Sequence, residues 1–181
     1  MTTDLHELGW RAADFELAGV DGKRYGLAQV RGPKGTVVMF ICNHCPYVKA
    51  AIGRITADMA ALAKLGIGAV AIMPNDTRAY PEDSLANMKA FAAANRFGFP
   101  YVIDETQETA RAYGAVATPE FFGFNAALEL EYRGRLDVGK TTAPPPDAKR
   151  ELYDAMCQIA ATGKGPREQI PTMGCSIKWR Y

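Results

Sequence analysis

Two cysteines three positions apart are the residues best suited to do chemistry in this 181-residue chain. They are Cys42 and Cys45, and Asn43 and His44 separate them ahead of Pro46. A gap of this size lets one turn of chain bring both sulfurs within disulfide-bonding distance. In a reducing compartment, a lone C-x-x-C is more often redox-active or metal-binding than structural. The spacing therefore predicts a pair of thiols that cycles to a disulfide.

The elements expected on either side give each thiol a role. A β-branched and aromatic run predicts a buried strand over 36–41, and helical spacing predicts a helix over 46–65 that begins at Pro46. Free N–H groups and the dipole at a helix start favour thiolate over thiol. We expect Cys42 to be the nucleophile, exposed at the turn, and Cys45 to be the resolving thiol behind it.

His44 stands directly before the second cysteine. A positive charge beside a thiolate lowers the pKa of the thiol, so His44 is expected to assist Cys42. A surface histidine without a role is the alternative.

Two other interpretations of the cysteine pair are possible. A structural zinc site would need two more ligands, and Cys157 and Cys175 are badly spaced to supply them. Inert core cysteines are the other alternative, but the junction of a strand and a helix is a poor place to bury thiols. No metal is therefore expected. Cys157 is expected to be half-buried packing, and Cys175 a structural cysteine rather than a further thiol of the site.

Periodicity and turn residues predict an α/β sheet covered on both faces, in one domain over residues 1–181. The last part, residues 163–181, reads as a C-terminal tail. The other expected elements are a hairpin over 14–27, strands over 69–73 and 101–103, helices over 83–95 and 109–113, a hairpin over 121–132 and a final helix over 147–160.

Composition narrows the functional classes. Apolar residues make up 48% of the chain and charged residues 23%, which is typical of a folded globular domain. The net charge of +1 gives no reason to expect nucleic acid or an anionic membrane as partner. The start of the chain has no apolar signal segment, and no G-x-G-x-x-G or P-loop is present, so we expect a cytoplasmic protein without an organic cofactor.

A second feature is the pair Thr118-Pro119, which precedes an expected strand. Proline is acceptable as the first residue of a strand but poor inside one. Only about 5–6% of X–Pro bonds are cis in folded proteins, so the dipeptide alone predicts a trans turn.

These segments together resemble the thioredoxin superfamily, and most closely its thioredoxin-like and peroxiredoxin-like branch, AhpC/TSA. The resemblance extends over nearly the whole chain, and the segment from Asn43 to Val48 is its most specific part. The other matching segments are Asn75-Asp76, residues 80–84, residues 101–107, residues 110–115, Thr118-Pro119, residues 132–135 and residues 174–179.

The resemblance implies a thioredoxin fold, with a central mixed sheet, helices on both faces and an N-terminal hairpin extension. It implies that Pro119 is a cis proline facing the thiols, and that the backbone beside Thr118 pairs with an extended substrate. His44 and Pro46 complete the expected supporting residues.

This chain departs from the family pattern at two places. Ala117 stands where many relatives have a cysteine before the Thr-Pro pair. The peroxide-binding Thr or Ser and arginine of peroxiredoxins are also replaced, the first by Cys42 and the second within residues 117–119.

The leading expectation is therefore a thiol–disulfide oxidoreductase that takes a protein or small-molecule disulfide as substrate and an unidentified thiol as electron donor. A peroxiredoxin-like thiol peroxidase with an antioxidant role is the alternative. A non-catalytic module that binds a partner or a metal is a third possibility.

Overall fold

Strand β3 (Gly35–Phe40) is the structural centre of the sheet. The computed structural model describes residues 6–181, so residues 1–5 of the expected domain lie outside the described part. Every residue of β3 is buried, as expected for an apolar strand covered on both faces. It pairs in parallel with β4 (Ile67–Met73) and antiparallel with β7 (Glu120–Phe124).

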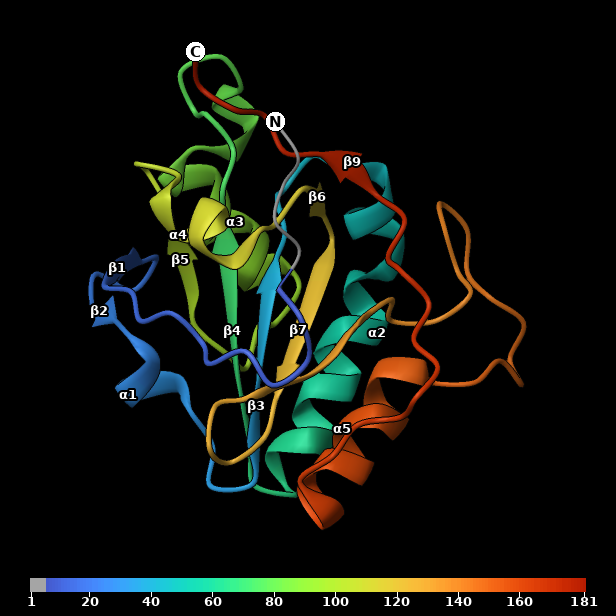
Figure 1. Ribbon diagram of the computed structural model, residues 1–181. Helices are drawn as coiled ribbons and strands as arrows, with labels where there is room; N and C mark the ends of the chain where they lie inside the picture. The colour runs from blue at the N-terminus through green and yellow to red at the C-terminus, as the bar shows by residue number, and fades with distance from the viewer. Residues whose placement is uncertain (1–5) are drawn as a thin grey trace.

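The sheet has seven strands in the order β2-β1-β5-β4-β3-β7-β8, with parallel pairs in the middle and antiparallel pairs towards both edges (Figure 1). This mixed sheet confirms the expected α/β fold. The N-terminal hairpin is also confirmed, since β1 and β2 pair antiparallel beside β5. The remaining strands of the sheet are β1 (Leu17–Gly19), β2 (Arg24–Tyr25), β5 (Tyr101–Ile103) and β8 (Leu130–Gly134).

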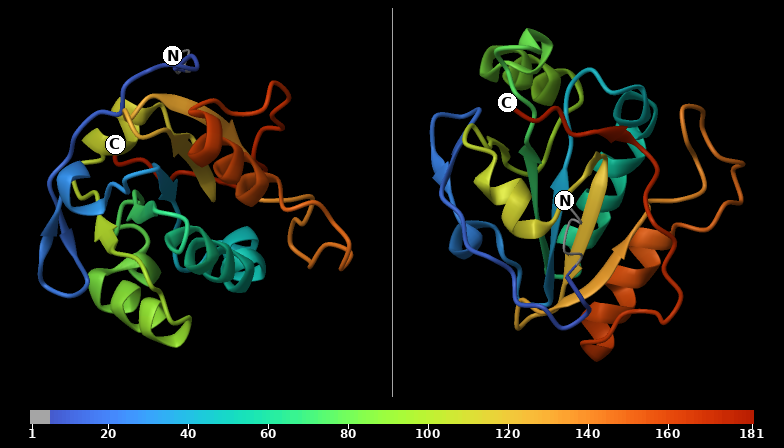
Figure 2. Two further views of the ribbon diagram at one scale, coloured as in Figure 1. Left: turned by 90° about the horizontal axis from the view of Figure 1, so that it is seen from below. Right: turned by 45° about the horizontal axis from the view of Figure 1, so that its top comes forward.

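Helices cover both faces of the sheet (Figures 1 and 2). One apolar cluster joins the sheet to α2 (Pro46–Ala63), α3 (Leu85–Ala94) and α5 (Glu151–Thr162). The cluster on the opposite face includes α1 (Leu27–Val30) and α4 (Glu108–Tyr113). Among the described residues, no helix is both long and apolar enough to cross a bilayer.

Two helices begin later in the chain than the sequence predicted. The last helix begins at Glu151 rather than at residue 147, because residues 145–148 form a turn after the proline run. Asp83 ends a short 3-10 turn, η1 (Pro81–Asp83), instead of opening the next helix. Ser84 caps α3, and its hydroxyl accepts a hydrogen bond from the backbone N–H of Asn87.

The C-terminal tail returns to the carboxyl end of β3. Strand β9 (Cys175–Ser176) pairs antiparallel with β6 (Ala117–Thr118), and the sequence predicted neither strand (Figure 1). Ile177 is buried on the side of the sheet that α1 and α4 cover. The sequence motifs at 75–76, 107 and 174–179 therefore meet in space.

Side-chain and backbone hydrogen bonds fix the tail just after β9. The backbone N–H of Lys178 donates to Asn75 Oδ1 at 2.9 Å, and Gln107 Nε2 donates to the carbonyl of Lys178 at 2.9 Å. Gln107 Oε1 then accepts from the backbone N–H of Arg180 at 2.9 Å. Because Asn75 and Gln107 are both buried, these bonds hold the tail firmly against the sheet.

Two glycines of this fold should respond to alanine in opposite directions. A Cβ at Gly68, in β4, would meet the backbone carbonyl oxygen of Val30, while a Cβ at Gly53, in α2, meets no atom within 4 Å. We expect Gly68→Ala to destabilise the protein by about 2 kcal/mol or more, because backbone must move. Gly53→Ala should stabilise it by about 0.5–1 kcal/mol, since alanine favours a helix. Urea unfolding midpoints measure both, and equal effects would contradict this packing.

Candidate active site

Cys42 and Cys45 lie in the short connection between β3 and α2, as the sequence predicted. Helix α2 begins at Pro46, so Cys45 is its N-cap residue. Both cysteines are buried, with 1% of Cys42 and none of Cys45 exposed. The expectation that Cys42 is exposed at the turn is therefore wrong. Cys42 lies two residues after the end of β3, where the chain is still within the apolar core.

Thr118, the last residue of β6, contacts both thiols. Its Oγ1 lies 3.4 Å from the Cys42 sulfur, and its carbonyl oxygen lies 3.3 Å from the Cys45 sulfur, which donates to it when protonated. The bond between Thr118 and Pro119 is cis, in agreement with the expectation drawn from the family resemblance. Strand β6 thus places its last residue directly over the cysteine pair.

Cys175 is the third thiol of the site. Its sulfur lies 2.8 Å from the sulfur of Cys45, although 130 positions separate the two residues in sequence. The expectation that Cys175 has only a structural role missed this contact, because it depends on the pairing of β9 with β6. Cys157, in contrast, is half-buried on α5 and packs against the core, as expected.

The surroundings make Cys45 the acidic thiol. Hydrogen bonds from Cys42 and Cys175, together with the backbone N–H of Val48 in the first turn of α2, hold the pKa of Cys45 well below that of an ordinary cysteine. The pKa of Cys42 is raised, because its proton is shared with Cys45, it is buried, and Asp83 is nearby. These directions favour Cys45 as the thiolate of the pair, whereas the sequence analysis expected Cys42.

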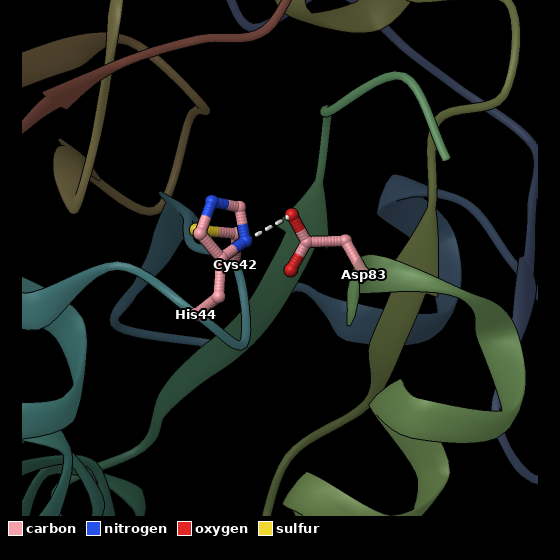
Figure 3. A group of neighbouring side chains, drawn as sticks. All are labelled: Cys42, His44 and Asp83. Atoms are coloured by element: carbon pink, nitrogen blue, oxygen red, sulfur yellow. Dashed lines mark ion pairs between the residues drawn. The ribbon is translucent and has the colours of Figure 1, made fainter. Parts of the chain in front are cut away.

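His44 is paired with an acidic residue. Its Nδ1 lies 2.7 Å from Oδ2 of Asp83, a carboxylate that is fully buried (Figure 3). Asp83 also accepts hydrogen bonds from the backbone N–H of Asn43 at 2.8 Å and from Asn75 Nδ2 at 2.9 Å. The negative charge of Asp83 raises the pKa of Cys42, and the expected effect of His44 on that pKa stays a prediction.

Asp83 is a site residue that the sequence analysis did not single out. Its place in a Glu-Asp-Ser segment is typical of the start of a helix, and nothing local in that segment points to a redox site. Asn43 is fixed in a similar way, because its side-chain oxygen accepts a hydrogen bond of 2.8 Å from the buried hydroxyl of Tyr101. Both residues between the cysteines are thus held by polar contacts from other elements.

The site also contains a candidate set of metal ligands. One ligand atom from each of Cys42, His44 and Asp83 lies within 4.8 Å of the others (Figure 3). A structural zinc ion takes four ligands, and the carboxylate here already accepts three short contacts from protein groups. The set is better suited to moving a proton than to closing a metal shell, and a metal-free site remains a prediction.

Two arginines at the end of β8 are engaged in ion pairs. Arg133 contacts Glu120 at 2.6 Å, and Arg135 contacts Glu151 at 2.9 Å. Glu120 also accepts a hydrogen bond of 2.8 Å from the backbone N–H of Val116. Arg133 therefore supports the loop that leads into β6, and both guanidinium groups are already matched by a carboxylate.

Comparisons with known proteins find solved structures that match this chain over nearly its whole length. An uncharacterized conserved protein from Geobacillus kaustophilus is 40% identical, with a TM-score of 0.92 over 98% of this chain and 94% of that one. A hypothetical protein from Sinorhizobium meliloti 1021 is 35% identical, with a TM-score of 0.88 over 97% and 96% of the two chains. A search of curated proteins found no match.

More distant structures show the fold. The thioredoxin domain of a thiol-disulfide oxidoreductase from Bacteroides vulgatus aligns with a TM-score of 0.66 at 13% identity, over 86% of this chain and 99% of that one. The fold is thus the thioredoxin fold, as expected. The family model of AhpC/TSA matches residues 8–136, a segment that holds β3, both cysteines of the pair, Asp83 and Pro119. The chain therefore belongs to the AhpC/TSA family.

Proposed function

We propose that this protein is a thiol–disulfide oxidoreductase that exchanges disulfides through Cys42 and Cys45. The observation that carries the proposal is the setting of Cys45, an acidic thiol at the start of α2 with the Cys42 thiol beside it. Membership of the AhpC/TSA family supports a redox enzyme. Structures of the same fold include a thiol-disulfide oxidoreductase, which supports the same reaction class.

In the proposed reaction Cys45 is the nucleophile, which reverses the roles expected from sequence. Its thiolate attacks one sulfur of the substrate disulfide, and a mixed disulfide forms while the other substrate sulfur leaves as a thiolate. That thiolate takes a proton from solvent. The helix N-terminus favours this role, because it stabilises negative charge on the N-cap residue.

Cys42 then resolves the mixed disulfide. It must first lose its proton, and the imidazole of His44, which is partly exposed to solvent and has a ring nitrogen within 4.8 Å of the Cys42 sulfur, accepts it. The Cys42 thiolate attacks the Cys45 sulfur, so that a Cys42–Cys45 disulfide forms and the second substrate thiolate leaves. An external thiol then reduces the protein disulfide and completes the cycle.

A protein or small-molecule disulfide and a thiol donor are the partners that this chemistry requires. Nucleic acid and membranes are not needed for it, and a cytoplasmic location remains a prediction.

A peroxiredoxin-like peroxidase is the second candidate. The family and the lowered pKa of Cys45 favour it, because peroxide also reacts with a thiolate. Against it, Arg133 and Arg135 are already paired with glutamates, and the position three residues before Cys45 holds a cysteine. We therefore rank disulfide exchange first.

Serine substitutions separate the two roles. Cys45→Ser should lower the rate of exchange with a small aromatic disulfide at least about a thousandfold, because the nucleophile is lost. Combined with Cys175→Ser, which removes the thiol 2.8 Å from Cys45, Cys42→Ser should still react once and then accumulate the mixed disulfide at Cys45, which intact-mass spectrometry detects. Cys157→Ser, on α5, is the matched control and should leave the rate unchanged. Accumulation in Cys45→Ser instead would restore the roles expected from sequence.

The lowered pKa of Cys45 predicts an unusual pH dependence. For an ordinary thiol with a pKa near 8.5, the fraction present as thiolate falls roughly eightyfold from about pH 8 to about pH 6. The pKa of Cys45 lies well below this range, so its thiolate persists and its alkylation by iodoacetamide should change little. Tandem mass spectrometry of the peptide that contains both cysteines locates the label. A steep fall at Cys45 would show that its pKa is ordinary.

A further inference from the structure

The C-terminal tail occupies the edge of the strand beside the thiols. Strands β6 and β9 pair antiparallel, with Ala117 opposite Ser176 and Thr118 opposite Cys175. An extended peptide that adds to a strand edge is held in this manner, by main-chain hydrogen bonds with its side chains set at fixed positions. Here the peptide is part of the chain itself, and the side chain it presents to Cys45 is a thiol.

We propose that Cys175 is the third redox-active cysteine of the site and acts as a built-in exchange partner of Cys45. The inference rests on the proposed function, because it requires that Cys45 enter a disulfide. In it, the oxidised pair passes its disulfide outward, from Cys42–Cys45 to Cys45–Cys175. The tail strand thereby behaves as an internal substrate.

The exchange step is balanced within the protein once a substrate disulfide has oxidised the pair. Cys175 gives up its proton, and its thiolate attacks the Cys45 sulfur. The bond between Cys45 and Cys175 forms, the bond between Cys42 and Cys45 breaks, and the electron pair leaves on Cys42, which takes up a proton. No net oxidation occurs in this step, since one disulfide replaces another.

The charge on Cys45 determines when Cys175 can ionise and the exchange step can occur. In the reduced protein, burial and the negative charge on Cys45 raise the pKa of Cys175, so that it keeps its proton. When Cys45 enters a disulfide it loses that charge, and the opposition to ionising Cys175 falls. Lys178, three residues further along, favours the Cys175 thiolate.

The three thiols differ in their exposure to solvent, and this difference explains what the exchange step achieves. Cys42 and Cys45 are both buried, whereas Cys175 is half-buried on the tail. A disulfide that includes Cys175 therefore presents one sulfur where an external thiol can attack it. The tail would carry oxidising equivalents from the buried pair to the surface, where the electron donor meets them.

Gly174 allows the tail to approach β6 closely. A Cβ at this position would meet the backbone carbonyl oxygen of Thr118 and would lie 3.1 Å from the nitrogen of Pro119. Only glycine lets the chain pass so near to β6. Thr172 adds a second tie, because its hydroxyl donates to the carbonyl of Pro119 at 2.8 Å.

Trypsin digestion provides a direct test, because it places the cysteine pair and Cys175 in different peptides. Cleavage at lysine and arginine places Cys42 and Cys45 together in peptide 35–49 and Cys175 in peptide 168–178. Reduced Cys157→Ser protein is mixed with one equivalent of 4,4′-dithiodipyridine, quenched in acid at successive times, blocked with N-ethylmaleimide and digested. A looped peptide 35–49 reports the Cys42–Cys45 disulfide, and the two peptides linked together report a disulfide to Cys175.

The proposal predicts that the linked peptides form in the Cys157→Ser protein. They should still form when this protein also carries the Cys42→Ser substitution, and they should not form when it also carries Cys45→Ser. Gly174→Ala keeps every thiol but pushes the tail away, and it should lower the yield of linked peptides severalfold while the looped peptide still forms. Gly98→Ala is the control, because a Cβ there meets no atom within 4 Å.

Two other outcomes have distinct meanings. If only the looped peptide forms and Cys175 is blocked by maleimide at every time, the role of Cys175 is overturned and the proposed function stands. If no disulfide forms at any cysteine, the proposed function fails and the present inference fails with it.

Discussion

The surroundings that lower the pKa of the buried Cys45 are the constraint on which the rest of the site depends. A charge removed from water must be compensated by hydrogen bonds and dipoles, and here these come from three directions. The first turn of α2 supplies the N–H of Val48, the end of β3 supplies the Cys42 thiol, and the tail supplies Cys175. Each element must hold its position for Cys45 to remain acidic.

Residues far from the sulfurs support this arrangement. Arg133 and Glu120 hold the loop that enters β6, while Asn75 and Gln107 hold the tail that follows β9. These bonds explain why motifs scattered along the sequence belong to one site. Asp83 has a different part, since it orients His44 and discourages the ionisation of Cys42, so that one thiol of the pair carries the charge.

Local patterns in the sequence were enough for the sheet, the main helices and the position of the cysteine pair, because hydrophobic periodicity and the strand-to-helix junction are short-range features. The order of acidity was not predictable, since it depends on which cysteine caps α2 and on the burial of Cys42. The contacts of Asp83 and Cys175 depend on tertiary packing, and no spacing rule connects residues 130 positions apart such as Cys45 and Cys175.

The most direct test of this account compares two oxidants of Cys45. Fully reduced protein is mixed with hydrogen peroxide or with a small aromatic disulfide at the same concentration and pH, and the loss of the Cys45 thiol is followed by quenched-flow mass spectrometry. The account predicts a reaction with the disulfide well above that of free cysteine, and a reaction with peroxide close to that of free cysteine. Peroxide reacting many orders of magnitude faster than with free cysteine would contradict it and make peroxide reduction the function.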